Sequence, residues 1–289
     1  MERLRKYLIS TITVQLEVFR LMLQRDIFPY YKKTTTELTR LYEMFKERFN
    51  DTYVEELCMC RGYIGEEQKS LIEEMELGYC DIFDMEELGD MRRELGLVSE
   101  NDIFLLSNRF IIPVEDIGGN IVSLIGYYPD KKKYITTPSP FFSKECMFFN
   151  FRQAYELSWA CYDGFVILVE GLFDCLSLRS IGLPAIATMG ADVSSIKGEL
   201  LKLFKKVLAI PDDDVTGRRA LNRYSRHGWN VPSNTTMLKF IGGTVDFNGT
   251  PLHCKDMDNF VSWYDANDVR EILLSYKDSR EEVETLSLV

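Results

Sequence analysis

The chain has 289 residues, of which 46% are hydrophobic, and it carries a net charge of −11 at pH 7. No stretch reaches the roughly 18 uninterrupted apolar residues of a membrane span, and the N-terminus lacks the apolar core and cleavage site of a signal peptide. These features exclude a membrane-spanning or secreted protein and predict a soluble, cytoplasmic protein that buries one or two substantial cores.

Residues 1–50 form the first predicted segment, and it is helical. Apolar residues recur there at helical spacing, with Pro29 as a break between two runs: Leu4, Leu8, Ile12, Leu16 and Phe19, then Leu38, Leu41 and Phe45. These helices either pack on the core or bind a partner, and packing is the commoner outcome.

Residues 51–100 hold the whole acidic excess, with fifteen Asp and Glu against four Lys and Arg. We expect these acids to lie on solvated helical faces, away from any nucleic acid. An acidic balance confined to one segment does not exclude nucleic-acid binding, but it predicts binding that is weak and sensitive to salt.

The stretch from Phe165 to Phe260 alternates short apolar runs with helix-like segments. Four runs predict strands: Phe165–Val169, Pro184–Thr188, Val207–Ile210 and Thr235–Ile241, the last leading through a loop to Lys255. Alternation at this spacing predicts a parallel sheet with right-handed crossovers and flanking helices. A final helix is expected over Asp265–Lys277, with Asp265 as its cap and a polar tail after it.

Acidic residues follow the predicted strands at their carboxyl ends, where ligands bind in such sheets. Glu170 follows the first strand, Asp212 and Asp214 the third, and Asp256 and Asp258 the fourth. Clustered carboxylates cannot all stay ionised without a cation among them, and their oxygens suit Mg2+ or Mn2+. Alone, the D-D-D run at 212–214 would more commonly be a solvated turn or a helix cap.

Four blocks in this region resemble a Toprim domain when they are taken in order: E-G-x-x-D at 170–174, A-T-M-G at 187–190, D-x-D-x-x-G at 212–217 and K-D-x-D at 255–258. Upstream blocks resemble the polymerase-domain half of DnaG-like primases: N-R-F-I-I-P-V at 108–114, K-Y-I-T-T-P at 133–138 and F-x-K-x-x-M-F-F-N at 142–150. The segment Y-V-E-E-L-C-M-C-R-G-Y at 53–63 is similar to the one that opens that half. The resemblance covers roughly residues 41–261.

The resemblance implies an α/β fold in which the Toprim sheet follows a mixed α+β primase-type subdomain and N-terminal helices. It divides the chain into a helical segment at 1–50, a primase-type basic half at 51–160, a Toprim domain at 161–262, and a C-terminal helix and tail at 263–289. By the family's pattern, Glu170 is the carboxylate closest to the reacting hydroxyl. The implied catalytic residues are Glu170, Asp174, Asp212 and Asp214, and the implied metal ligands are Glu170, Asp212, Asp214, Asp256 and Asp258.

The resemblance also implies nucleotide- and template-binding residues at Asn108, Arg109, Lys133, Lys144, Gly171 and Gly190. The chain departs from the family where glycines and an arginine usually follow Ile125-Gly126, because it reads Tyr127-Tyr128-Pro129-Asp130 there. One binding cation is therefore missing, or it is replaced by Lys131 or Lys132. The run of three lysines at 131–133 would otherwise be a solubilising hairpin tip.

The implied function is that of a DNA primase, which synthesises short RNA primers on single-stranded DNA from ribonucleoside triphosphates by metal-dependent nucleotidyl transfer. Seven cysteines form no C-x-x-C pair and only two histidines are present, so no zinc site is expected in this chain. The family's zinc-binding and helicase-docking domains have no room, which suits a compact phage or mobile-element form. A replicative helicase and a separate zinc-binding protein are the partners that this form allows.

Two alternatives stay open. A Toprim nuclease would keep the acidic blocks but has no use for the three basic ones. A catalytically silent replisome adaptor would not need five intact motif acids.

Overall fold

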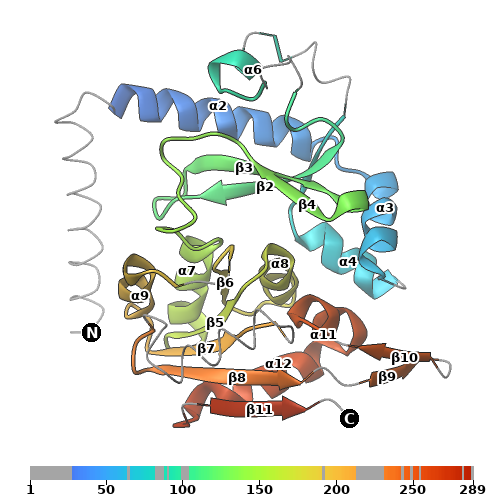
Figure 1. The fold of residues 1–289 in the computed structure, drawn as a ribbon, viewed down its shortest axis with the longest axis vertical. Helices are drawn as coiled ribbons and strands as arrows, with labels where there is room; N and C mark the ends of the chain where they lie inside the picture. Colours follow the sequence, from blue (N-terminus) through green and yellow to red (C-terminus); the bar gives the residue numbers. More distant parts are fainter. Residues whose placement is uncertain are drawn as a thin grey trace. The chain divides into compact units, whose positions relative to one another are not determined.

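The computed structural model describes residues 28–63, 66–81, 88–89, 91–98, 104–190, 193–212, 231–241, 244–247, 250–253, 255–281 and 283–287. The chain divides into two compact units (Figure 1). The first comprises Met1–Tyr53 and Leu77–Phe142, and the second comprises Val54–Glu76 and Ser143–Val289. These two units are defined by packing, whereas the four domains predicted from the sequence are defined by motifs. The division into four domains stays a prediction.

The first unit is built on an antiparallel sheet of four strands in the order β1-β2-β3-β4. The strands are β1 (Gly78–Cys80), β2 (Arg109–Glu115), β3 (Ile121–Tyr128) and β4 (Lys133–Thr136). Helix α2 (Phe28–Lys46) packs on β1, β2 and β3, and the short α6 (Met91–Glu94) and η1 (Pro129–Lys131) complete the described elements. Pro29 lies in the first turn of α2, where its missing N–H costs no hydrogen bond.

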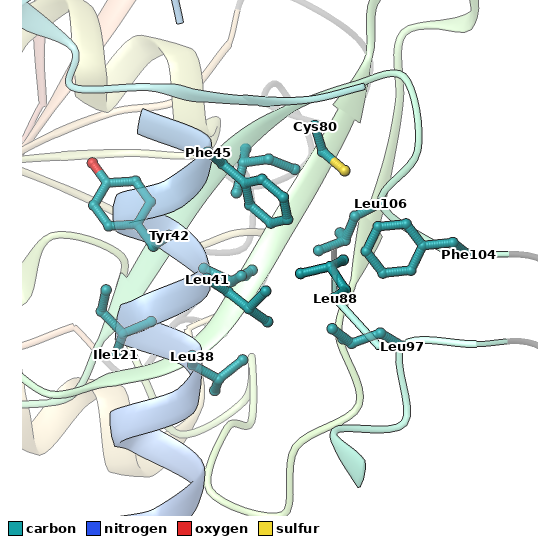
Figure 2. Close-up of a cluster of buried hydrophobic side chains, with 12 residues drawn as sticks. Leu38, Leu41, Tyr42, Phe45, Cys80, Leu88, Leu97, Phe104, Leu106 and Ile121 are labelled. Carbon is teal, nitrogen blue, oxygen red and sulfur yellow. The ribbon is translucent and has the colours of Figure 1, made fainter. Parts of the chain in front are cut away.

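The core of the first unit lies between α2 and the sheet. Leu38, Leu41 and Phe45 project from α2 into a buried cluster that includes Leu106 and Phe104 (Figure 2). The apolar spacing predicted for this helix is therefore the spacing that faces the sheet. Strand β3 is buried along seven of its eight residues, which fixes the position of the β3–β4 turn.

The second unit contains a parallel sheet of five strands in the order β11-β8-β7-β5-β6. Its strands are β5 (Phe165–Val169), β6 (Ala185–Ala187), β7 (Lys206–Ile210), β8 (Thr235–Ile241) and β11 (Val283–Ser287). The central strand β5 is buried at every residue, as the continuous apolar run of a strand covered on both faces requires. The four strands predicted from the sequence and their parallel arrangement are confirmed.

Helices α7 (Phe151–Cys161) and α8 (Leu172–Ser180) pack on β5 and β6, and α11 (Met257–Trp263) packs on α8. Three further helices belong to this unit: α4 (Glu66–Glu74), α9 (Ser195–Leu201) and α12 (Ala266–Ser275), which the short η2 (Tyr276–Asp278) follows. Helix α3 (Asp51–Arg61) begins in the first unit and ends in the second. The Asp265 side chain caps α12 by accepting from the N–H groups of Asn267 and Asp268, as predicted.

Two features of the second unit differ from the sequence prediction. The loop expected after β8 holds a hairpin, β9 (Thr244–Phe247) with β10 (Thr250–His253). The expected polar tail forms β11, which pairs in parallel with β8 at the sheet edge. Among the residues described, no helix is both long enough and apolar enough to cross a membrane.

Candidate metal and nucleotide site

The first Toprim-like block follows β5 directly. Gly171 is the N-cap of α8, and Asp174 lies in the first turn of that helix, where it is buried. A Cβ at Gly171 would run into Oδ2 of Asp174, so the glycine leaves room for the carboxylate. The structure therefore connects Gly171 to packing around Asp174.

The second block is bonded to the first. The N–H of Thr188 donates to the carbonyl of Val169 at 2.9 Å, and the N–H of Met189 donates to the carbonyl of Glu170 at 3.1 Å. Met189 holds this turn with φ of 58°, and a Cβ at Gly190 would meet nothing within 4 Å. The backbone around Glu170 is thus held in place, and the space beside Gly190 is open.

A buried lysine holds the same turn in place. Nζ of Lys197 donates to the carbonyl of Thr188 at 2.6 Å and lies 5.3 Å from the centre of the Phe148 ring. Its side chain is almost wholly inaccessible to solvent. A buried ammonium needs such partners, because burial of an unpaired charge is costly.

The third and fourth blocks meet through an ion pair. Asp212 follows β7, and its Oδ2 lies 3.6 Å from Nζ of Lys255. Asp256, the next residue, is the N-cap of α11, since its side chain accepts from the N–H of Asn259 at 3.0 Å. The structure therefore brings the D-x-D and K-D-x-D blocks together.

Asp212, Asp256 and Asp258 all lie close enough to Asp174 to affect its pKa. Burial raises the pKa of Asp174 well above its usual range, and the charges of Asp256, Asp212 and Asp258 add to the increase. Burial, followed by the charge of Asp258, also raises the pKa of Asp256. Asp174 therefore resists ionisation in the metal-free protein, as expected for acids gathered without a cation.

Asp258 differs from the other acids because three side-chain donors hold its carboxylate. Arg61 donates to Oδ2, and Tyr63 and Ser177 donate to Oδ1, the latter at 2.5 Å. The N–H of Asp258 in turn donates to Oδ1 of Asp174 at 2.9 Å. The Asp258 side chain is only 1% exposed.

Sequence reasoning missed the three donors to Asp258. The block Y-V-E-E-L-C-M-C-R-G-Y contains Arg61 and Tyr63, and its R-G-Y end was the signal that could have drawn attention to them. Nothing in the sequence relates that end to Asp258, which lies almost two hundred residues further along the chain.

The donor set fits a hard divalent cation, because oxygen ligands of this kind suit Mg2+ or Mn2+. Among the described residues, no three Asp, Glu, His or Cys side chains are grouped closely enough to hold a metal as they stand. Asp214, one of the predicted ligands, lies outside the described residues. The proximity of Asp212, Asp256 and Asp258 to the buried Asp174 is the observation that is consistent with a cation here.

A row of three cationic side chains lies in the first unit, at the end of the sheet where β2 begins: Arg109, Lys131 and Lys133. Tyr128 pairs with Lys133 across β3 and β4, and the Arg109 guanidinium lies 5.3 Å from the centre of the Tyr128 ring. Nζ of Lys131 lies 5.5 Å from the centre of the same ring. In the part of the chain that the structure describes, no carboxylate forms an ion pair with any of these three cations.

Arg109 is fixed in this row before anything binds. Its Nε donates to the carbonyl of Leu105 at 2.9 Å, and its stem lies across Gly126, where an added Cβ would come within 2.6 Å of Cδ. Gly126 is therefore a glycine because Arg109 occupies the space above it. The side chain holds its position without an acidic partner, which leaves the charge available to a ligand.

The remaining predicted binding residues lie on turns. Asn108 is exposed with φ of 52°, a conformation that asparagine tolerates, and it precedes β2. Lys132 is the left-handed C-cap of η1 in the β3–β4 connection, and among the described residues the cations that lie over the Tyr128 ring are Arg109 and Lys131. Lys144 is exposed in the turn before α7, in the second unit.

Comparisons with known proteins agree with this geometry. Residues 167–250 match the Toprim-like family. The chain is 37% identical to a DNA primase of Aquifex aeolicus over 126 residues, which are 42% of this chain and 24% of the relative. It is 27% identical to a DNA primase of Clostridium acetobutylicum over 225 residues, which are 67% of this chain and 36% of the relative. The matched regions therefore span well under half of these relatives.

Solved structures extend the likeness over most of the chain. The crystal structure of the zinc-binding and RNA polymerase domains of Aquifex aeolicus primase aligns with a TM-score of 0.63 and 25% identity, covering 84% of this chain and 60% of that one. A DnaG primase catalytic domain bound to single-stranded DNA aligns with a TM-score of 0.60 and 16% identity, covering 86% and 80%. The chain thus has a Toprim domain and the fold of a primase catalytic core. In sequence and in fold, the chain is thus similar to DnaG-like primases over the regions that these comparisons cover.

Proposed function

We propose that this chain is a DNA primase that synthesises short RNA primers on single-stranded DNA from ribonucleoside triphosphates. The observation that carries the proposal is the gathering of acids in the second unit: Asp212, which follows β7, and Asp256, the N-cap of α11, both lie near the buried Asp174 and raise its pKa. The Toprim-like match and the primase relatives support the same reaction. In the cell it would act in the cytoplasm, where chromosome replication takes place.

We assign the metal site to Glu170, Asp212, Asp214 and Asp256. Mg2+ or Mn2+ bound there would neutralise charge on the triphosphate as the new bond forms. The part of the protein is to hold these oxygens at the ends of β5, β7 and α11. Asp174, whose carboxyl resists ionisation, is assigned to shaping this site from the first turn of α8.

Template and nucleotide phosphates are assigned to Arg109, Lys131 and Lys133, with Asn108 and Lys144 as further contacts. Arg109 and Lys131 both lie against Tyr128, which holds two like charges near one another. This contact favours Lys131 over Lys132 as the replacement for the cation missing after Gly126. The open space beside Gly190 suits a ligand that approaches the backbone of the A-T-M-G turn.

The test is primer synthesis on single-stranded templates with labelled ribonucleotides and either Mg2+ or Mn2+. Wild-type protein should produce short labelled RNA, and Asp212→Asn should produce none at saturating metal. Equal incorporation by the two proteins would contradict the proposal. Degradation of the labelled template in place of synthesis would identify a Toprim nuclease.

A replicative helicase and a separate zinc-binding protein stay proposed partners, and a phage or mobile-element origin stays a prediction. Phosphate contacts position a strand without reading its sequence. We therefore expect the isolated chain to initiate with weak sequence preference and to gain rate when a partner concentrates the template. Sharp initiation at one trinucleotide by the isolated chain would contradict this expectation.

A further inference from the structure

The carboxylate of Asp258 is bound on both oxygens by the protein itself. Oδ2 accepts from the Arg61 guanidinium, and Oδ1 accepts from the hydroxyls of Tyr63 and Ser177. A carboxylate offers about four lone-pair sites, and three are occupied here. A divalent ion at this carboxylate would have to share Oδ2 with a guanidinium that already neutralises it, on a side chain that is 1% exposed.

The donors are themselves fixed. Gly62 turns the chain at the end of α3 with φ of 75°, and the N–H of Tyr63 donates back to the carbonyl of Cys58 at 2.9 Å. This turn directs Arg61 and Tyr63 toward the same carboxylate. The Arg61 guanidinium also lies 4.3 Å from the centre of the Phe173 ring, beside Asp174 in sequence. Its side chain is only 16% exposed, so water competes little for the pair.

The backbone of Asp258 connects this fixed carboxylate to two neighbouring acids. Its N–H donates to Oδ1 of Asp174, and it stands in the first turn of α11, which Asp256 caps. A displacement of Asp258 would therefore move an acid on either side of it: Asp174 through the hydrogen bond and Asp256 through the chain.

We propose that Asp258 is an internal anchor for the acidic site and not a metal ligand, and that Arg61, Tyr63 and Ser177 are positioning residues acting through it. This inference deepens the proposed function. It rests on the proposed primase reaction only for the role that the acidic site plays, because metal binding and stability can be measured without primer synthesis. It replaces the metal role that sequence reasoning gave to Asp258.

The test is Mn2+ binding followed by the electron paramagnetic resonance signal of free Mn2+, together with the thermal midpoint of unfolding. Asp212→Asn serves as the reference for loss of a ligand. We expect Asp258→Asn to keep the number of bound Mn2+ ions and to lower the thermal midpoint. Asp212→Asn should instead lower Mn2+ affinity at least tenfold with little loss of thermal midpoint.

Two further variants keep the test decisive where Asp258→Asn folds poorly. Tyr63→Phe removes a single hydroxyl and should lower the thermal midpoint with an unchanged Mn2+ count. Arg61→Met leaves a buried carboxylate unpaired, so its thermal midpoint should fall further, and Arg61→Met combined with Asp258→Asn should recover part of that loss.

The opposite pattern would overturn the inference. Loss of bound Mn2+ in Asp258→Asn at an unchanged thermal midpoint, matching Asp212→Asn, would make Asp258 a ligand. Failure of the proposed primase activity has a different signature, since wild-type protein would then bind Mn2+ and respond to these variants as described but synthesise no primer.

Discussion

Replacing Gly126 by alanine should weaken binding of single-stranded DNA without removing any charge. The added Cβ would lie 2.6 Å from Cδ of Arg109, and also 3.1 Å from Leu106 and 3.2 Å from Ile135. Ordinary carbon contacts need about 3.5–4.0 Å, so the Arg109 stem must move by about 1 Å.

The magnitude follows from the two contacts that hold Arg109. Its Nε bond to the Leu105 carbonyl, 2.9 Å long, would be lost, and such a bond contributes about 1 kcal/mol. Its contact with the Tyr128 ring, at 5.3 Å, contributes about 0.5–1 kcal/mol at a partly exposed site. If binding uses this preformed position, the affinity for single-stranded DNA should fall by up to about thirtyfold.

Fluorescence anisotropy of a labelled oligonucleotide, repeated over a range of salt concentrations, measures this effect. Loss of one phosphate contact should reduce the slope of log affinity against log salt by about 0.7. Arg109→Ala is the matched control, because combining it with Gly126→Ala removes the clash and should add no further loss. Wild-type affinity and salt slope in a folded Gly126→Ala protein would refute the reasoning.

Three other predictions concern the metal site and the core. Asp212→Asn should abolish Mg2+-dependent primer synthesis with an unchanged circular dichroism spectrum, and residual synthesis at saturating metal would rule out its role as a ligand. The raised pKa values of Asp174 and Asp256 mean that the folded protein keeps protons that the unfolded chain releases above about pH 4, so metal-free stability should decline as pH rises through the folded-state values. Thermal melts should therefore show a larger stabilisation by Mn2+ at pH 8 than at pH 5, and equal stabilisation would count against the clustering of these acids. Leu41→Ala should cost about 3 kcal/mol in denaturant unfolding because Leu41 is 1% exposed in the core between α2 and the sheet, and a loss below about 1 kcal/mol would mean that the core is loosely packed.

The parallel sheet could be predicted from the sequence because its strands carry local signals. Phe165–Val169 is apolar at every position, which suits a strand buried on both faces, and Glu170 marks its end. Strand β11 lacks such a signal. Its sequence V-E-T-L-S includes a half-buried Glu284 and an exposed Thr285 at the sheet edge, so it reads as a polar tail until β8 provides hydrogen bonds.

The sequence predicted that the D-x-D and K-D-x-D blocks lie together, and the ion pair of Asp212 with Lys255 agrees with this, whereas the role of Asp212 and Asp256 as metal ligands stays a prediction. The environment of Asp258 was not predictable, because Arg61 and Tyr63 reach it from a separate helix and no spacing rule relates them. The same limit applies to Gly126, whose small size follows from an arginine in the neighbouring strand. Sequence motifs predict which groups are chemically active, and long-range packing determines which of these groups a ligand can reach.

The second compact unit is assembled from two separate stretches, Val54–Glu76 and Ser143–Val289. A fragment beginning at Ser143 would retain every Toprim-like block and the whole parallel sheet, yet it would lack Arg61 and Tyr63. Its Asp258 would keep only Ser177 of its three donors, inside a protein interior that tolerates lone charges poorly. Exchanging this unit between proteins that share the fold therefore needs two junctions in the chain. A separate peptide covering residues 54–76 is the natural candidate to complement the fragment that begins at Ser143.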